Sequence, residues 1–231
     1  NPKIQLSDSH RLRLINSSNT GFLDLAMEDA QWIGSDQGLR SQATGLDELL
    51  LVTGDRADIL TNGGVLSAHP YSHLGGERFG ESKALFTVES ELSAFSLSDW
   101  NFSQETPTPD SGRTDGYYSF QGDPRTSRWL INGEVFPEIT IQEFEFGTTQ
   151  ILEIRNVSAT EHPFHLHGLK FEILSVNGTA PDFRQIEDTF NIRPFQRVRI
   201  LVEMDNLGDW MTHCHILPHA ENGMMTVLRV K

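Results

Sequence analysis

Apolar and polar residues alternate with a period of two in several short stretches of the chain. In residues 197–204 nearly every second residue is apolar, and residues 152–155 repeat the pattern. A period of two is typical of a strand with one buried face. Asn-Gly pairs, at Asn132-Gly133 and Asn177-Gly178 among others, mark turns between such runs. Many short strands separated by turn signals predict an all-β sandwich or barrel.

One stretch interrupts this pattern. Residues 104–125 are rich in Thr, Pro, Asp, Ser and Gly and contain few apolar residues. Such a composition predicts a long linker rather than a strand. We therefore expect a first domain over residues 1–103 and a second over residues 126–231.

Similar segments flank the predicted linker. NPKIQL at 1–6 parallels FPEITI at 136–141, and LRLINSS at 12–18 parallels LEIRNVS at 152–158. The offset stays close to 140 residues, which chance similarity would not maintain. Two copies of one β domain explain it.

The two copies differ in chemistry and in extent. At this offset the imidazoles of the second copy fall opposite apolar residues of the first: His162, His165 and His167 opposite Phe22, Leu25 and Met27. Nothing before Asn1 matches residues 129–135. We expect the first domain to be a scaffold that is incomplete at its amino-terminal end, and the second to carry the chemistry.

Charge and cysteine content narrow the functional classes. Acidic residues outnumber basic ones, 32 to 18, for a net charge of −14. Nucleic acid requires clustered Lys and Arg, so no nucleic-acid partner is expected. No apolar run has the length of a membrane span, so no membrane partner is expected either. The single cysteine, Cys214, excludes an intrachain disulfide.

Six of the nine histidines lie in two short clusters. The first is HPFHLHG at 162–168, and the second is HCHILPH at 213–219, with Met224 five residues later. Side chains alternate faces along an extended strand, so one tripeptide, 213–215, can serve two metal sites. A thiolate, two imidazoles and a distant thioether form a blue-copper site. Cys214, His219, Met224 and one histidine of the first cluster supply that set.

These residues also allow other interpretations. A zinc site is one, although structural zinc prefers paired short spacings of Cys or His. The isolated residues His10, His69 and His73 are expected to be ordinary surface or core histidines. Met224 alone would be core filler. The coincidence of six clustered histidines, the only cysteine and this methionine favours metal binding.

The two clusters closely resemble the carboxy-terminal copper signatures of multicopper oxidases, a family that includes laccases. RLRLINSSN at 11–19 and GDRADIL at 54–60 look like segments of the middle domain of three-domain members. The resemblance implies tandem cupredoxin-like Greek-key β-sandwich domains. It also implies copper as cofactor, with type 1, type 2 and binuclear type 3 sites and four ions in the complete enzyme.

The resemblance assigns roles residue by residue. His162, Cys214 and His219 would bind type 1 copper, with Met224 as weak axial ligand. His165 would bind type 2 copper, and His167, His213 and His215 the type 3 pair. Electrons would enter near His219 and pass through Cys214 and its histidine neighbours, so Cys214, His213, His215 and His219 are the expected catalytic residues.

Two features depart from the family pattern. The family's trinuclear cluster takes eight histidines, four of them from an amino-terminal domain with two His-x-His motifs. Those motifs are absent here, so we expect a separate or removed amino-terminal cupredoxin segment as partner. Several bacterial members carry a proton-delivering glutamate directly after the type 1 histidine. Here Ala220 takes that place and Glu221 follows.

Three functions are consistent with these residues. The first is a laccase-like oxidase that couples one-electron oxidation of a small phenolic or metal-ion reductant to four-electron reduction of dioxygen, and that is inactive without the amino-terminal segment. The second is a non-catalytic blue-copper carrier or copper-binding protein that uses only the type 1 site. The third is a structural cupredoxin relative, which the intact ligand set disfavours. A periplasmic or extracellular location is expected.

Overall fold

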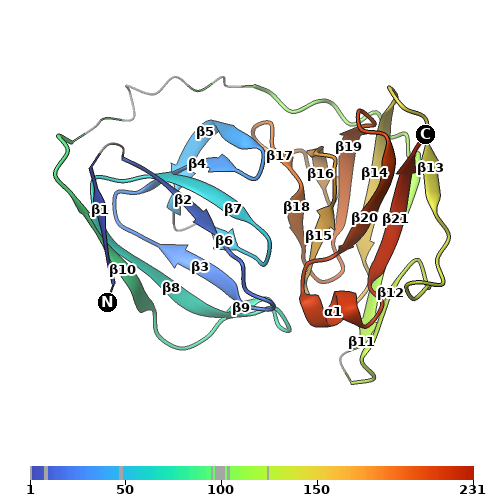
Figure 1. Ribbon diagram of the computed structural model, residues 1–231, viewed down its shortest axis with the longest axis horizontal. Helices are drawn as coiled ribbons and strands as arrows, with labels where there is room; N and C mark the ends of the chain where they lie inside the picture. Colours follow the sequence, from blue (N-terminus) through green and yellow to red (C-terminus); the bar gives the residue numbers. More distant parts are fainter. Residues whose placement is uncertain are drawn as a thin grey trace.

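The computed structural model describes residues 2–7, 10–46, 49–94, 96, 102, 105–123 and 125–231. These residues form two β-sandwiches that lie side by side (Figure 1), as the strand alternation predicts. The expected boundary between residues 103 and 104 lies outside the described residues, and so does Pro124, near the end of the expected linker. Within the described part of the chain, no helix is both long and apolar enough to cross a membrane.

The first sandwich has two sheets, with strand orders β1-β10-β8-β3-β6 and β2-β7-β4-β5, and β9 pairs with β8. Its strands are β1 (Lys3–Leu6), β2 (Arg11–Ile15), β3 (Phe22–Ala26), β4 (Gln31–Ser35), β5 (Gly38–Gly45), β6 (Leu50–Leu51), β7 (Arg56–Leu60), β8 (Gly64–Ser72), β9 (Glu77–Arg78) and β10 (Lys83–Ser90). Leu25 and Ile59 are among the residues that fill the core between the sheets.

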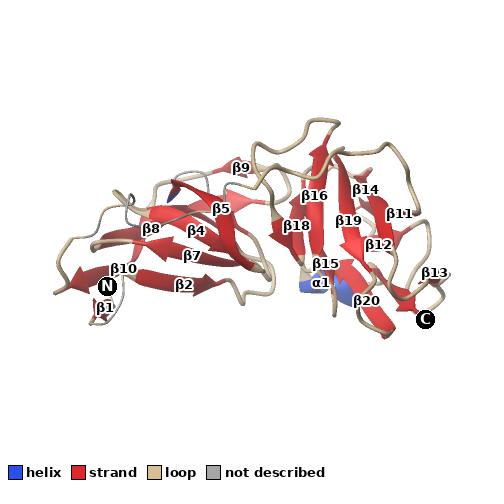
Figure 2. Ribbon diagram, turned by 90° about the horizontal axis from the view of Figure 1, so that it is seen from above, coloured by secondary structure: helices blue, strands red, loops and turns tan. Residues whose placement is uncertain are grey.

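The second sandwich also has two sheets, with orders β12-β11-β14-β19-β16-β17 and β13-β21-β20-β15-β18. Its elements are β11 (Gly116–Asp123), β12 (Arg128–Ile131), β13 (Gln142–Phe144), β14 (Thr149–Asn156), β15 (His162–Leu166), β16 (Phe171–Val176), β17 (Ile186–Glu187), β18 (Thr189–Ile192), β19 (Arg197–Glu203), β20 (Gly208–Cys214), α1 (Leu217–Glu221) and β21 (Met225–Val230). Figure 2 shows both sandwiches from above, with the short helix α1 in the second.

The strand pairings repeat at an offset of about 140 residues, although residues 136–141, which the sequence comparison sets against 1–6, form no strand and β1 corresponds instead to β13. β1 pairs in parallel with β10 as β13 does with β21, and β3 pairs with β8 as β15 does with β20. The turns after β2 and β14 contain equivalent hydrogen bonds. The Ser18 amide donates to the Asn16 side chain, and the Ser158 amide donates to the Asn156 side chain. β11 and β12 have no counterpart among the described strands of the first sandwich.

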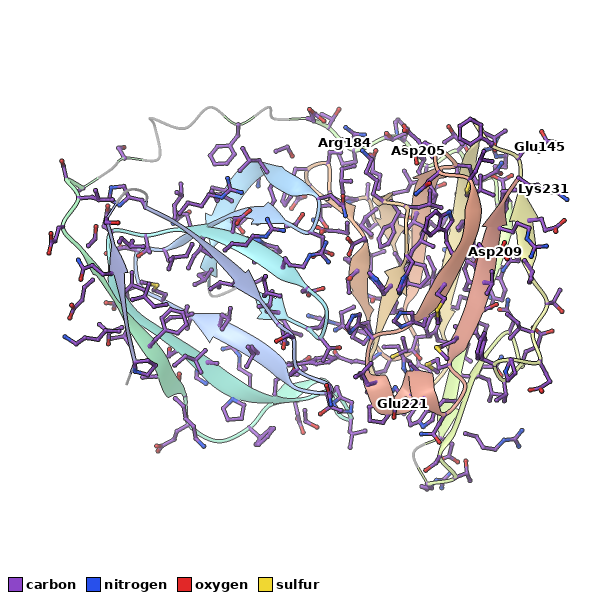
Figure 3. The ribbon with its side chains drawn as sticks, in the orientation of Figure 1. Glu145, Arg184, Asp205, Asp209, Glu221 and Lys231 are labelled. Atoms are coloured by element: carbon purple, nitrogen blue, oxygen red, sulfur yellow. The ribbon has the colours of Figure 1, made fainter. Side chains whose placement is uncertain are left out.

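The segment expected to be a linker differs from that expectation in two ways. Residues 116–123 form β11, which pairs in parallel with β14, because Tyr118 and Phe120 are fully buried in the core. Residues 105–115 form no strand, but they are fastened to the second sandwich. Thr108 donates its amide to Glu172 at 2.6 Å, and Arg184 pairs with Glu105 at 2.8 Å. Figure 3 labels Arg184 near the upper edge of this sandwich.

This segment also changes one face of β19. The alternation in residues 197–204 places Arg199 toward solvent, yet it is only 7% exposed. Its guanidinium donates to Asp110 at 2.6 Å and to Glu153 at 3.1 Å. The polar segment covers a polar strand face, so Arg199 and Glu153 are buried as an ion pair.

Candidate metal centres

Two neighbouring antiparallel strands, β15 and β20, carry four of the eight predicted ligands, and His167 and His215 follow directly after them. Their register places Phe164 opposite Cys214 and His165 opposite His213. Because side chains alternate along each strand, ligands on one face of the pair separate from those on the other. We call His162, Cys214 and His219 the cysteine group, and His165, His167, His213 and His215 the histidine group.

The donor atoms of the cysteine group converge. Sγ of Cys214 lies 3.6 Å from Nδ1 of His162 and 3.5 Å from Nδ1 of His219, and the two Nδ1 atoms are 3.2 Å apart. All three residues are buried. Three atoms with lone pairs face one another, and there are too few protons among them for each to be satisfied by a hydrogen bond. A cation bound between them would satisfy all three, and a thiolate with two imidazoles is a ligand set that copper favours.

Neighbouring residues fix the rings of this group. Nε2 of His162 lies 2.7 Å from Oγ of Ser158 and 3.2 Å from Oγ1 of Thr160, which leaves Nδ1 for the centre of the group. The Trp129 indole stacks on the imidazole of His219. Partners of this kind hold a ligand's tautomer and orientation.

Burial sets the protonation of the group. It lowers the pKa of His219 to about 3 and that of His162 well below its usual value, so both imidazoles are neutral and able to bind a metal. Burial also raises the pKa of the Cys214 thiol far above its usual range. A bound cation would be needed to hold the thiolate, and binding would release a proton.

Met224 lies beside the cysteine group. Its amide donates to the carbonyl of His219 at 3.0 Å, and its carbonyl accepts from the amide of Cys214 at 3.2 Å. The side chain is fully buried in the same apolar cluster as Cys214. Met225, at the start of β21, is partly exposed and pairs with His213.

The histidine group brings four imidazoles together on the other face of the strands. Nε2 of His167 and Nε2 of His213 are 2.9 Å apart. The ring centroid of His165 lies 4.8 Å from that of His167 and 5.3 Å from those of His213 and His215. Nδ1 of His215 is buried without a hydrogen-bond partner, so a bound metal ion would satisfy it.

Backbone carbonyls set two of these tautomers. Nδ1 of His165 donates to the carbonyl of Asp188 at 3.0 Å, and Nδ1 of His213 donates to that of Cys214 at 2.8 Å. A carbonyl oxygen only accepts, so each Nε2 keeps its lone pair for a metal. Burial lowers the pKa of His213 to about 4, so its ring is neutral.

The histidine group is more open than the cysteine group. A hollow of about 410 Å³ reaches it and is lined by His165, His167, Asp188 and Asp205 among others. The His165 side chain is 17% exposed, whereas His162 and Cys214 are fully buried. Further ligands can therefore approach only the histidine group.

Two of the isolated histidines, His10 and His73, lie in different surroundings. His10 contacts the carbonyls of Thr61 and Ser93 through its two ring nitrogens, as an ordinary structural histidine does. His73 instead lies edge-on to His219, with ring centroids 6.1 Å apart. Nothing in its local sequence indicates this, because the contact forms between the two sandwiches.

Other contributors also escape sequence reasoning. Trp129 lies far from both clusters in the sequence. Asp188 and Arg56 approach the histidine group from different sandwiches, although Arg56 lies inside the segment GDRADIL at 54–60 that resembles the middle domain of three-domain members. Glu221 is exposed on α1 (Figure 3), whereas Ala220 is buried.

Fold and site together define a protein of tandem cupredoxin-like domains with two clusters of metal-ligand side chains. Residues 107–231, more than half of the chain, match the family model described as multicopper oxidase. This chain belongs to the multicopper oxidase family, whose name implies copper.

Individual relatives agree with this assignment. A multicopper oxidase of Staphylococcus epidermidis is 32% identical over 241 residues, which cover 100% of this chain and 50% of the relative. A laccase of Haloferax volcanii is 27% identical, with 94% of this chain and 43% of the relative covered. The chain spans about half the length of the curated relatives that it matches.

Solved structures give the same result. The crystal structure of a multi-copper oxidase from Pediococcus acidilactici matches all of this chain and 50% of its own, with a TM-score of 0.80 and 27% identity. A metallo-oxidase from Campylobacter jejuni matches all of this chain and 55% of its own, also with a TM-score of 0.80, at 25% identity.

Proposed function

We propose that this chain is the carboxy-terminal part of a laccase-like multicopper oxidase. It would couple one-electron oxidation of a small phenolic or metal-ion reductant to four-electron reduction of dioxygen to water. The cysteine group would hold type 1 copper with Met224 as weak axial ligand. The histidine group would hold its share of the type 2 and type 3 copper, with His165 on the type 2 ion.

One observation carries the proposal: Cys214 and His213 are consecutive residues that belong to different groups. A single peptide unit therefore connects a buried thiol site to a multi-histidine site. A structural zinc site would not need such a connection, whereas an oxidase that collects electrons at one site and uses them at another does.

Copper at these ligands would supply one-electron redox chemistry, with dioxygen as the final acceptor. The residues of this chain prepare both sites. Ser158 and Thr160 hold Nε2 of His162, and the carbonyls of Asp188 and Cys214 hold Nδ1 of His165 and His213. Burial keeps water from Cys214 and keeps His213 neutral.

We further propose that an amino-terminal cupredoxin segment with two His-x-His motifs completes the histidine group. The hollow beside His165 and His167 supports this, because it gives such a segment access. The length of the relatives, about twice the matched region, agrees with it. A periplasmic or extracellular location is proposed along with it.

The alternative function is a blue-copper carrier that uses the cysteine group only. Its support is that His162, Cys214 and His219 are complete and buried within the second sandwich. Under this alternative the histidine group would bind no functional copper.

Copper content and oxygen consumption distinguish the two. The chain is loaded with copper alone and together with a cupredoxin segment that carries two His-x-His motifs; the same segment with those histidines changed to Ala is the control. We expect about one firmly bound copper per chain alone and about four with the segment. Oxygen consumption with a phenolic donor should appear only in the second case.

Two results would contradict the proposal in different ways. Sustained reduction of dioxygen by the 231 residues alone would mean that no further ligands are needed. A blue protein that never gains cluster copper or oxygen consumption with the segment would establish the carrier instead.

A further inference from the structure

Loops of the first sandwich, which contains no predicted ligand, reach the histidine group of the second. Arg56, at the start of β7, donates two hydrogen bonds to the Asp188 carboxylate, at 2.7 and 2.5 Å. The Arg56 side chain is 22% exposed and that of Asp188 is 13% exposed. A bidentate guanidinium–carboxylate pair in a half-buried interface fixes both partners in orientation.

Asp188 in turn contacts His165, one of the proposed ligands. Its backbone carbonyl accepts from Nδ1 of His165, and its carboxylate accepts from the Thr189 hydroxyl at 2.9 Å. That hydroxyl lies 2.9 Å from the same Nδ1. Arg56 therefore stands two contacts from the imidazole of His165.

Asp36, in the turn after β4, fastens the same loop. Its carboxylate accepts from the Thr189 amide at 2.9 Å and from the Arg56 amide at 2.8 Å. The Gln37 side chain donates to Asp188 at 2.6 Å. The first sandwich therefore holds residues 188–189 in addition to β15, whose Leu166 amide donates to the Asp188 carbonyl at 3.0 Å.

A second contact reaches the group independently. Gly54 has a φ of +89°, and a Cβ atom at this position would lie 2.6 Å from Cδ2 and 2.8 Å from Nε2 of His215. Only glycine adopts this backbone conformation without strain and leaves room for the imidazole. The loop before β7 therefore forms the wall against which the His215 ring rests.

We propose that Arg56 and Gly54 are positioning residues for the histidine group: Arg56 fixes the ring orientation and tautomer of His165 through Asp188, and Gly54 fixes the place of His215. The inference rests on the proposed function, in which this group binds copper. It gives the ligand-free sandwich a specific task beyond support.

The cysteine group should not depend on these residues. The contacts that orient His162 come from Ser158 and Thr160, and Trp129 covers His219; all three belong to the second sandwich. Loss of Arg56 should therefore disturb one group and spare the other.

The first test uses the metal-free chain. Nitrogen-15 chemical shifts of the imidazoles report which ring nitrogen carries the proton. We expect His165 to be in the Nδ1-protonated form in the parent chain and to become a mixture of both tautomers in Arg56→Gln. Arg56→Lys, which keeps the charge without the bidentate geometry, should be intermediate. Arg13→Gln is the matched control, because Arg13 pairs with Asp58 within the first sandwich.

The second test is a Cu(II) titration, against a competing chelator, of the chain together with the segment that carries two His-x-His motifs. The blue absorption band follows the cysteine group, and the non-blue electron paramagnetic resonance signal follows the histidine group. In Arg56→Gln we expect the affinity of the histidine group to fall about 10- to 100-fold, as for other residues that orient metal ligands, while the blue band persists. Gly54→Ala should have the same effect through His215.

The outcomes separate the two claims. An Arg56→Gln chain with the parent tautomer and parent copper affinity would overturn the positioning role. So would equal loss of both groups in Arg56→Gln and Arg56→Lys, since that would indicate general unfolding. A parent chain that holds no copper at the histidine group even with the His-x-His segment present would overturn the proposed function, while the tautomer measurement, made on the chain alone, would still test the positioning role.

Discussion

The indole of Trp129 lies flat on the imidazole of His219, with ring centroids 3.5 Å apart and planes inclined by 18°. The same indole meets His162 edge-on at 5.8 Å. Trp129 is 5% exposed and comes from β12, in the sheet opposite the two strands that bear the ligand clusters. One aromatic side chain therefore holds two members of the cysteine group against the core.

Replacement of Trp129 should weaken both the fold and the site. We expect Trp129→Ala to lower the free energy of unfolding by about 3–5 kcal/mol because it leaves a large cavity. Copper should also leave the cysteine group faster, as measured by decay of the blue band in chelator. Trp210→Phe, in the same sandwich, is the control. A Trp129→Ala chain that unfolds and loses copper like its parent would show that the stacking contributes nothing.

Cys214 should be unreactive in the folded metal-free chain. It is fully buried, and burial raises the pKa of its thiol, so the nucleophilic thiolate is scarce at pH 8. A chromogenic disulfide reagent should label it only after denaturant is added. Rapid labelling of the native chain would mean that the site opens readily to solvent.

The blue colour should depend on the same residue. Charge transfer from the thiolate to Cu(II) gives blue-copper sites their intense visible band, so Cys214→Ser should be colourless when loaded with copper. Copper content is measured in parallel, so that loss of colour is distinguished from loss of metal. A blue Cys214→Ser protein would disprove the assigned thiolate ligand.

Met224 and its neighbour provide a matched pair. As a weak axial ligand, Met224 can be replaced by Leu with retention of the blue band and a higher reduction potential. Met225→Leu should leave the potential unchanged, because Met225 begins β21 and is partly exposed. Loss of the blue site in Met224→Leu would identify Met224 as a strong ligand.

Glu187 should make stability fall as pH rises. Burial, followed by the nearby carboxylate of Asp36, raises its pKa from 4.5 to about 8. The folded chain therefore retains a proton that the unfolded chain releases near pH 4.5. The stabilisation that protonated Glu187 contributes is fully present below that pH and is lost progressively up to about pH 8.

Thermal unfolding between pH 5 and pH 9 measures this effect. We expect a loss on the order of 4 kcal/mol in the parent chain, from about 1.4 kcal/mol per pH unit between pH 5 and pH 8, and a flatter profile in Glu187→Gln, whose neutral amide mimics the protonated acid. Glu145→Gln, a substitution at an exposed position of the second sandwich labelled in Figure 3, is the control. An identical pH profile in Glu187→Gln and its parent would show that Glu187 is ionised throughout.

Sequence reasoning succeeds where the information is local. The alternation in residues 197–204 predicts β19, and the 140-residue offset predicts the repeated pairings. The strand rule that separates Cys214 from His213 predicts two groups on two faces, and the structure places them so. The alternation and the strand rule need only neighbours along the chain, and the offset needs only a comparison of two segments.

It fails where distant segments meet. The alternation predicts that Arg199 faces solvent, but residues 105–115 cover it. The composition predicts that β11 is linker, because the polar residues around it outnumber Tyr118 and Phe120. The contact of His73 with His219 joins the two sandwiches. No periodicity within one strand encodes such contacts.

The shared register of β15 and β20 has an evolutionary consequence. Because side chains alternate, a one-residue insertion or deletion within β20 would turn Cys214 toward the imidazoles and an imidazole toward His162 and His219. Both groups would be destroyed in one step, so neither can be improved by sliding the strand. Variation in this protein must instead arise in the loops and neighbouring side chains around a strand pair whose length is fixed.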